Sequence, residues 1–303
     1  MGRSDEWGIV TVPTSADPET RAIKRLQIAS ELSLSNYGTP IVVAVSGGKD
    51  SSVCVELARR AGIPFEVLHS HTTADAPETV RFVRDEFRRL EELGIQCSYQ
   101  WPTYKGEQTS MWRLIPQKLM PPTRLVRYCC AVLKETGGTG RMISTGVRWA
   151  ESTARKRRGI FEKQVFNPAE AVSTKSDTDS LENLFAPCKL AAKRVVNPIV
   201  DWSDDDVWQF CADAKIPLNP LYREGFCRVG CVGCPMAGAS GREAEFARWP
   251  KYRQMYINAF ERMLQVRRSK DKPAYGWQTG LDVYHWWMED GVMPGQIDLF
   301  EEK

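Results

Sequence analysis

The stretch 41–62, IVVAVSGGKDSSVCVELARRAG, decides the fold. It begins with β-branched apolar residues typical of a buried strand, turns through Ser46, Gly47 and Gly48, and continues in a helical pattern. Backbone N–H groups and the positive end of a helix dipole point to one place in such a strand–turn–helix unit, so it binds anions. The stretch therefore predicts a phosphate-binding loop at the end of a central strand.

The rest of the chain alternates the same two patterns, which predicts a doubly wound, mainly parallel, Rossmann-like α/β sheet. Further strands are expected at 65–71, 95–101 and 141–147, and helices at 18–34, 77–94 and 203–215. In the last of these, Ser203 and Asp206 form a capping-box-like pair. Residues 160–195 interrupt the alternation and are interpreted as an inserted loop.

The expected division of the chain has three parts: a helical lead-in at 1–38, a nucleotide-binding domain at 39–240, and a helical extension at 241–303. Pro250 should kink or split the first helix of the extension, because proline lacks the backbone N–H that a helix interior needs.

Composition narrows the function classes. The 303 residues are 42% hydrophobic and carry a formal net charge of +3, which does not by itself indicate a nucleic-acid binder. No run of 18 apolar residues and no apolar leader occurs, so a cytoplasmic location is expected. Nine cysteines in such a chain favour a metal site or sulfur chemistry over disulfides.

The loop has the groups that a polyphosphate needs. Lys49 adds a full positive charge, and the neighbouring serines add hydroxyl donors. It is not a Walker A loop, because Val43 and Asp50 occupy the positions of the first glycine and the final hydroxyl residue. A GxGxxG dinucleotide loop is absent as well. The loop residues of the predicted nucleotide site are Ser46, Gly47, Gly48, Lys49, Asp50, Ser51 and Ser52.

Clustered cysteines form the second pattern. Cys231 and Cys234 are spaced as a chelating pair, and the tandem Cys129 and Cys130 are the obvious source of two further ligands. Four thiolates suit either a zinc ion or an iron–sulfur cluster. A cluster held by three cysteines is a further alternative, and it would free Cys129 or Cys130 for chemistry.

The remaining cysteines differ in their surroundings. Cys227 extends the pair to a radical-SAM-like spacing, but the residues after Cys234 have helical patterns and not the βα units of that barrel. Cys227 and Cys188 are candidates for a thiol that carries a persulfide, with an unreactive cysteine as the equal alternative. Three cysteines lie in apolar patterns and are interpreted as inert: Cys54, Cys97 and Cys211.

The stretch SGGKDSS at 46–52 resembles the PP-loop of the ATP pyrophosphatases. The segments at 71–82, 145–159, 197–210 and 219–226 resemble the PAPS-reductase branch of that superfamily, so the resemblance covers about 40–240. It implies that Lys49 neutralises a leaving pyrophosphate and that Asp50 binds Mg²⁺. The nucleotide contacts expected outside the loop are His71, Thr72, Gly146, Arg148 and Arg155.

The resemblance also bears on the cysteines. VRYCCAVLKE is similar to the cysteine-pair segment of iron–sulfur members of the family, which combine such a pair with a distant Cys-x-x-Cys to hold a [4Fe–4S] cluster. It therefore favours that cluster on Cys129, Cys130, Cys231 and Cys234, with zinc as the alternative.

Three functions follow as hypotheses. The first is an ATP-dependent sulfur-inserting enzyme, resembling the sulfur-transfer proteins of DNA phosphorothioation and the tRNA-thiolating PP-loop enzymes. Its catalytic residues would be Lys49, Asp50 and Cys227. Its partners would be a sulfur donor such as a cysteine desulfurase, or a reductant, with nucleic acid, nucleotide or small metabolite as the acceptor.

The second hypothesis is an APS or PAPS reductase that forms sulfite. Family reductases carry a catalytic cysteine in a C-terminal Glu-Cys-Gly-Leu-His segment, whereas this sequence has no cysteine after Cys234. Their loop also usually departs from Ser-Gly-Gly-Lys-Asp-Ser, which is intact here, so the first hypothesis is favoured. The third hypothesis is a nucleotide-binding redox sensor, with the tryptophan-rich segment at 282–291 as a docking surface or as core.

Overall fold

The computed structural model describes residues 17–138, 140–164, 172–174 and 193–289, and these belong to two compact units. The first unit comprises 1–69, 78–100 and 137–229, and the second comprises 70–77, 101–136 and 230–303. Both units are therefore discontinuous in the sequence, because the chain passes from one to the other several times. Each unit is described by itself below.

The first unit is built on a seven-stranded sheet with the order β3-β2-β1-β6-β9-β7-β8. Its strands are β1 (Ile41–Ala44), β2 (Phe65–Ser70), β3 (Cys97–Gln100), β6 (Met142–Ser144), β7 (Phe161–Gln164), β8 (Val172–Thr174) and β9 (Lys193–Val196). β1 pairs in parallel with β2 on one side and with β6 on the other, and β6 pairs in parallel with β9. Since the chain winds outward from β1 in both directions, the doubly wound, mainly parallel fold class is confirmed.

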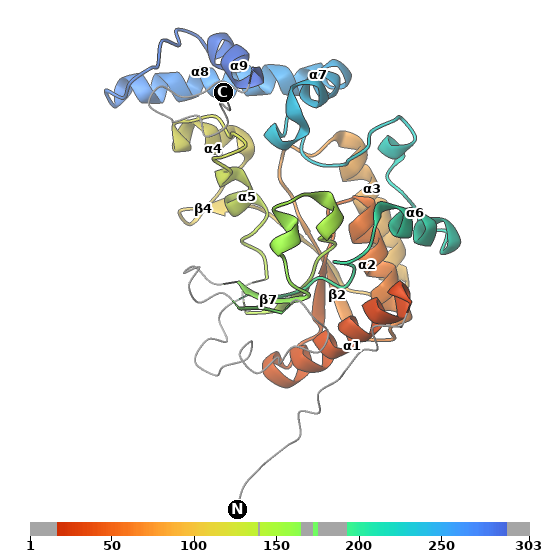
Figure 1. Ribbon diagram of the computed structural model, residues 1–303. Coiled ribbons are helices and arrows are strands. Elements are labelled where there is room, and N and C mark those ends of the chain that lie inside the picture. Colours follow the sequence, from red (N-terminus) through yellow and green to blue (C-terminus); the bar gives the residue numbers. More distant parts are fainter. Residues whose placement is uncertain (1–16, 139, 165–171, 175–192, 290–303) are drawn as a thin grey trace, which may run out of the picture. The chain divides into compact units, whose positions relative to one another are not determined.

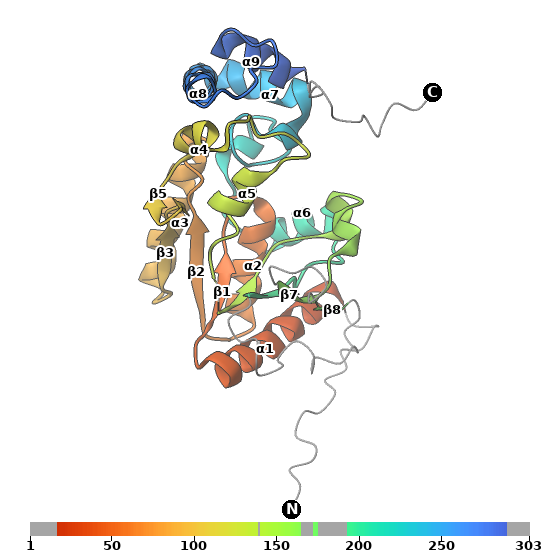
Figure 2. The same cartoon turned by 90° about the vertical axis from the view of Figure 1, so that its left-hand side faces the viewer.

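Four helices belong to this unit: α1 (Pro18–Tyr37), α2 (Lys49–Arg60), α3 (Pro77–Glu92) and α6 (Asp204–Asp213). Figure 1 shows all four in the red-to-green part of the chain, and Figure 2 shows α2 beside β1. The predicted capping box is present at α6, where the Ser203 hydroxyl oxygen accepts from the Asp206 N–H at 3.1 Å. The core between helices and sheet includes Val43, Leu57 and Val67, none of which is exposed.

The expectation that residues 160–195 form an inserted loop is wrong for the part that is described. β7 pairs antiparallel with both β9 and β8, which places two antiparallel strands at one edge of the sheet. Only Phe161 is apolar in β7, so the segment lacks an alternating apolar pattern. Pairing with β9 and the ion pair of Glu162 with Arg158 stabilise it instead. This is tertiary context, which overrides local propensity.

The second unit is mainly helical. Its elements are the hairpin β4 (Thr103–Tyr104) and β5 (Glu107–Gln108), and the helices α4 (Met111–Lys118), α5 (Tyr128–Leu133), α7 (Gly238–Arg248), α8 (Pro250–Ser269) and α9 (Gly280–Met288). Trp249 separates the end of α7 from the start of α8 at Pro250, so the expected break at Pro250 is confirmed. α8 packs against α4 and α9, and Tyr284 and Trp287 of the tryptophan-rich segment are buried. None of the helices in the described ranges has the length and hydropathy to cross a membrane.

Candidate functional site

The predicted phosphate loop connects β1 to α2 in the first unit. Gly47 has a φ of +80°, and Gly48 is the residue that precedes the helix. Ser51 closes the turn, because its hydroxyl donates to the Gly48 carbonyl at 2.8 Å and accepts from the Ser46 N–H at 3.2 Å. The first turn of α2 is thereby fixed, with its N-terminus at the carboxyl end of β1.

Gly47 is required at its position for two reasons. Its φ lies in the left-handed region that favours glycine, and a Cβ there would lie 2.7 Å from Thr79 Cγ2. Asn219 holds the same turn through two hydrogen bonds. Its buried side-chain amide donates to the Gly47 carbonyl and to the Thr79 hydroxyl, both at 3.1 Å. The loop is therefore held between α3 and the segment after α6.

Tyr222 supports the helix start. It belongs to a short 3₁₀ turn, Pro220–Tyr222, and its hydroxyl oxygen accepts from the Lys49 N–H at 3.0 Å. Burial raises the pKa of Tyr222 to about 12, so the hydroxyl stays protonated at neutral pH. Tyr222 therefore occupies one backbone N–H at the start of α2.

Four charged side chains form an ion-pair network beside the loop. The buried Arg148 donates from Nε to Asp50 Oδ1 at 2.6 Å and from one Nη to Asp204 Oδ1 at 2.7 Å. Lys49 Nζ lies 3.1 Å from Asp50 Oδ2 and 3.5 Å from Asp204 Oδ1. Each of the two cations thus contacts both carboxylates, and the four formal charges sum to zero.

The electrostatics follow from this arrangement. Although burial opposes it, the charges of Asp50 and Asp204 raise the pKa of Arg148. The hydrogen bond from Arg148, with the charges of Arg148 and Lys49, lowers the pKa of Asp204. The network therefore favours the charged forms of Arg148 and Asp204.

The backbone brings Arg148 to the loop. The turn after β6 is hydrogen-bonded to the end of β9 through Thr145 N–H to Val196 O, at 3.0 Å. Gly146 in this turn touches α2 closely, since a Cβ would lie 2.8 Å from the Asp50 carbonyl carbon. β1 and β6 are adjacent strands from which the chain winds in opposite directions. Ligands of open α/β sheets bind at such a switch point, outside the carboxyl ends of the strands.

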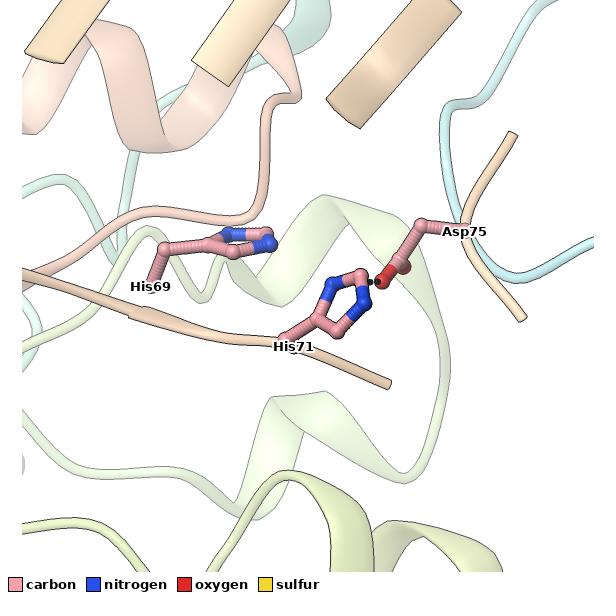
Figure 3. Close-up of side chains that lie close together, drawn as sticks. All are labelled: His69, His71 and Asp75. Carbon is pink, nitrogen blue, oxygen red and sulfur yellow. Dashed lines mark ion pairs between the residues drawn. The ribbon is translucent and has the colours of Figure 1, made fainter. Parts of the chain in front are cut away.

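Three other predicted contacts have partners outside the ion-pair network. Arg155 is in a short 3₁₀ turn and pairs with Glu151. His71 and Thr72 belong to the second unit. His71 Nδ1 lies 3.6 Å from Asp75 Oδ2 (Figure 3), and the Thr72 hydroxyl lies 3.3 Å from Cys231 Sγ. Their assignment to the nucleotide site stays a prediction.

The structure brings the four predicted metal-binding cysteines together in the second unit. Cys129 and Cys130 lie in α5, and Cys231 and Cys234 lie in the turn before α7. Asp75 forms an isolated antiparallel bridge with Cys231, which fixes the turn. None of the described cysteines forms a disulfide.

Charges around these thiols show how close they are. A hydrogen bond to Cys130, burial and the charges of the other three sulfurs raise the pKa of Cys129. The hydrogen bond from Cys129 lowers the pKa of Cys130, and Arg127 and Lys134 lower it further. Arg127 donates to Cys130 Sγ at 3.2 Å. The charges of Cys231 and Asp75 raise the pKa of Lys134. The thiolate is therefore favoured at Cys130, whereas the pKa values of Cys129 and Cys231 are raised.

The donor set fits a metal centre. The sulfurs of a tetrahedral zinc site, with Zn–S bonds of about 2.3 Å, lie within about 4 Å of one another. In the part of the chain that the structure describes, no three of these sulfurs lie within 4.8 Å of one another. The four thiols are a donor set that suits either a zinc ion or an iron–sulfur cluster.

The described cysteines outside the group of four are either buried to some degree or exposed, and the apolar sequence patterns indicate which. Cys54 and Cys211 are buried and Cys97 is half-buried, and burial raises the pKa of all three thiols. Cys227 is exposed and belongs to the first unit, five residues after Tyr222. Cys188 lies outside the described residues.

Sequence reasoning did not assign Asn219, Tyr222 or Asp204 to the site. The first two lie in the segment 219–226, which resembles the family pattern without indicating which side chain reaches the loop. Asp204 follows the helix-capping Ser203 and has the ordinary character of an acidic residue in a first helical turn. Only the fold shows that it faces Lys49 and Arg148.

Known proteins resemble this chain in sequence and in structure. Residues 40–237 match the phosphoadenosine phosphosulfate reductase domain. Adenosine 5'-phosphosulfate reductase of Allochromatium vinosum is 26% identical over 246 residues, which cover 79% of this chain and 82% of the relative. An uncharacterized protein of Methanocaldococcus jannaschii is 28% identical over 238 residues, which cover 76% of this chain and 48% of that protein.

Among solved structures, phosphoadenylyl-sulfate reductase from Candida auris aligns with a TM-score of 0.41 and 14% identity, covering 72% of this chain and 89% of that chain. The domain match extends over well more than half of this chain and includes the phosphate loop, Arg148 and the four clustered cysteines. The protein therefore belongs to the phosphoadenosine phosphosulfate reductase domain family, as the resemblance of its PP-loop and later segments implied.

Proposed function

We propose that the protein is an enzyme of sulfur chemistry that binds an adenine nucleotide at the carboxyl ends of β1 and β6. The observation that carries this proposal is the convergence of Lys49 and Arg148 beside the glycine turn and the N-terminus of α2. Both cations are buried, so their attraction for an anion is screened less than that of exposed side chains. A phosphate or sulfate group of the nucleotide would bind there.

Reduction of a sulfonucleotide is the activity that the relatives' names support, since several of them are called adenosine 5'-phosphosulfate reductase. A thiolate would attack the sulfate sulfur, forming an S–S bond and breaking the S–O bond, and AMP would leave. A second thiol would then form a disulfide with the first and release sulfite, so the two thiols supply both electrons. Among the described cysteines outside the cluster, Cys227 is the exposed candidate for the attacking thiol.

ATP-dependent sulfur transfer is a second candidate, and one feature of the loop favours it. The sequence SGGKDS is intact, and Lys49 Nζ pairs with Asp50 Oδ2 at 3.1 Å. A substrate oxygen would attack the α-phosphorus of ATP and release pyrophosphate, whose charge Lys49 would neutralise. Asp50 would be the carboxylate partner of Mg²⁺.

The second half of that reaction needs a sulfur donor. A persulfide on Cys227, loaded by an enzyme of the cysteine desulfurase class, would displace AMP and form a C–S bond. A dithiol reductant would then break the remaining S–S bond and release the thiolated product. The acceptor would be a nucleic acid, a nucleotide or a small metabolite.

The four clustered cysteines would hold a [4Fe–4S] cluster, with zinc as the alternative. Such a cluster supplies redox activity when it is bound. The chain's own contribution is to keep Cys130 deprotonated through Arg127 and Lys134, and to fix the Cys231 turn through Asp75.

One set of assays tests the proposal. Purified protein is incubated with APS, PAPS or ATP in the presence of a dithiol, and sulfite and pyrophosphate are measured. Sulfite from APS or PAPS supports the reductase, and pyrophosphate from ATP supports the sulfur transferase. Nucleotide binding without either product supports the sensor hypothesis instead, and no binding overturns the proposal.

Variants assign the roles. K49A should lose nucleotide binding, and C227S should lose product while it keeps nucleotide binding. C211S is the matched control, because Cys211 is buried in the same unit and should have no chemical role.

A further inference from the structure

The carboxylate of Asp204 occupies a position between the two cations of the phosphate loop. Its Oδ1 accepts from Arg148 at 2.7 Å and lies 3.5 Å from Lys49 Nζ. One oxygen atom thus contacts both positive groups, as a phosphate or sulfate oxygen of a ligand would. We propose that Asp204 is an internal anion that satisfies Lys49 and Arg148 until a phosphoryl or sulfuryl group displaces it. This inference rests on the proposed nucleotide site.

Exposure shows which member of the network can move. The side chain of Asp204 is 63% exposed, whereas those of Lys49 and Arg148 are 8% and 2% exposed. An exposed carboxylate regains water when it leaves an ion pair, so its release costs little free energy. The two buried cations lose no solvation when another anion replaces it. Asp204 is therefore the replaceable partner, and the cations are the fixed ones.

The start of α6 does not depend on the Asp204 side chain. The capping box uses Ser203 and Asp206: the Asp206 carboxylate accepts from the Ser203 N–H at 2.7 Å, and the Ser203 hydroxyl accepts from the Asp206 N–H. Asp204 is the first residue of the helix and extends from it toward Arg148. Its side chain can rotate outward while the helix keeps both capping bonds.

Asp50 has a different place in the network. Its carboxylate accepts from Arg148 Nε at 2.6 Å and lies 3.1 Å from Lys49 Nζ, and its side chain is 21% exposed. The backbone of Asp50 is also packed against Gly146. Asp50 therefore keeps the two cations together when Asp204 leaves, so the vacated position becomes an anion site with one excess positive charge.

The formal charges predict a direct consequence for affinity. With both carboxylates in place the four groups sum to zero, and an incoming pyrophosphate must compete with Asp204. Asp204→Asn removes the competing charge and keeps the size of the side chain. Loss of an exposed ion-pair partner of this kind should tighten pyrophosphate binding about three- to tenfold at low salt, and less at high salt.

The experiment measures binding of inorganic pyrophosphate by calorimetry, with EDTA present so that no metal contributes. Wild type, D204N and D205N are compared at low and high salt. Asp205 is the matched control because it is the next residue of the same helix, is exposed, and carries the same charge. D204E is the fourth protein, since it restores the negative charge at that position. Thermal unfolding of each variant verifies that it is folded.

The inference predicts tighter binding by D204N, binding by D205N within about twofold of wild type, and a return of D204E toward the wild-type value. Equal affinities of D204N and D205N would overturn it and leave the proposed nucleotide site intact. Weaker binding by D204N would also overturn it. A parallel titration uses ATP with Mg²⁺. If D204N binds ATP with Mg²⁺ more weakly than wild type does but binds pyrophosphate equally well, Asp204 is a metal ligand beside Asp50 and the inference is overturned. If neither pyrophosphate nor ATP binds to wild type or to any variant, the proposed function fails, and the inference fails with it.

Discussion

Arg148 donates from Nε to Asp50 Oδ1 at 2.6 Å, which links the turn after β6 to the second residue of α2. The two residues are 98 positions apart in the sequence. They meet because β1 and β6 are neighbours in the sheet. This contact assembles the candidate anion site from two strand ends, and its loss should affect stability and binding together.

We expect R148A to lower the free energy of unfolding by about 3 kcal/mol, because Asp50 and Asp204 lose one of their two shared partners and keep only Lys49. Pyrophosphate affinity should fall by more than about tenfold, since one of two buried cations is lost. R148K should keep part of the affinity, because lysine keeps the charge but cannot donate two hydrogen bonds in the forked geometry of a guanidinium group.

Urea unfolding measures the effect on stability, and calorimetry measures the effect on pyrophosphate affinity. R157A, in the exposed turn at Arg155–Arg157, is the control and should change neither; an R148A protein that binds as wild type would contradict the assignment.

Gly47 and Gly62 offer a matched pair for the phosphate loop. Both have positive φ values, +80° and +66°, so alanine strains the backbone of both by about 1 kcal/mol. At Gly62 nothing lies within 4 Å of the added Cβ, whereas at Gly47 it meets Thr79 Cγ2 at 2.7 Å. G47A should therefore lose more stability than G62A and should also lose pyrophosphate binding. Equal unfolding free energies and unchanged binding for the two variants would show that the close approach of α3 does not matter.

The clustered cysteines predict the metal content of the protein. Anaerobically purified protein should contain about four iron and four sulfide per chain. C231A should lose both, because Cys231 is a predicted ligand whose turn is fixed by Asp75. C211A should keep both, because Cys211 lies in the core of the first unit. Iron, sulfide and zinc analysis decides the question: stoichiometric zinc without sulfide would replace the cluster by a zinc site.

Asp201 predicts a pH-dependent part of the stability. Its carboxylate accepts from Arg25 at 2.7 Å and from Arg21 at 3.0 Å, which ties α1 to the segment after β9. Although burial opposes it, these two arginines lower the pKa of Asp201. A lowered folded-state pKa gives stability that is present above the unfolded value of about 3.9 and is lost as pH falls through the folded value.

D201N should therefore be about 3 kcal/mol less stable than wild type at pH 7, because the buried Arg25 loses the negative charge of Asp201. This difference should shrink as pH falls below about 4. There the Asp201 carboxylate is protonated first in the unfolded chain and then, at its lowered pKa, in the folded protein. Urea unfolding of both proteins between pH 3 and pH 7 measures it. A difference that is constant over this range would show that the ion pair is not its cause.

Local patterns in the sequence were sufficient to predict the central part of the fold. The strand at 41–45, the glycine turn and the helix after it agree with β1, the loop and α2. The break at Pro250 and the Ser203 capping box were predicted for the same reason, since both depend on neighbouring residues alone. β7 was not predicted, because a mostly polar strand is specified by its pairing with β9.

The candidate site was predictable only in part. Motifs indicate Lys49 and Arg148, and spacing in the sequence groups the four cysteines, which interact with one another in the structure. Asp204, Asn219 and Tyr222 were not identified. Their contacts with the loop arise from the packing of distant segments, and residue type alone gives no signal of that packing.

The interleaving of the two units limits how the chain can be divided. α4 comes from residues 111–118, yet it packs against α8, which begins at Pro250. A recombinant fragment that ends near residue 240 would leave the apolar surface of α4 exposed and would remove the core that contains Trp287. We expect such a truncation to aggregate, although it includes the whole matched region, so laboratory studies need the C-terminal helices as well.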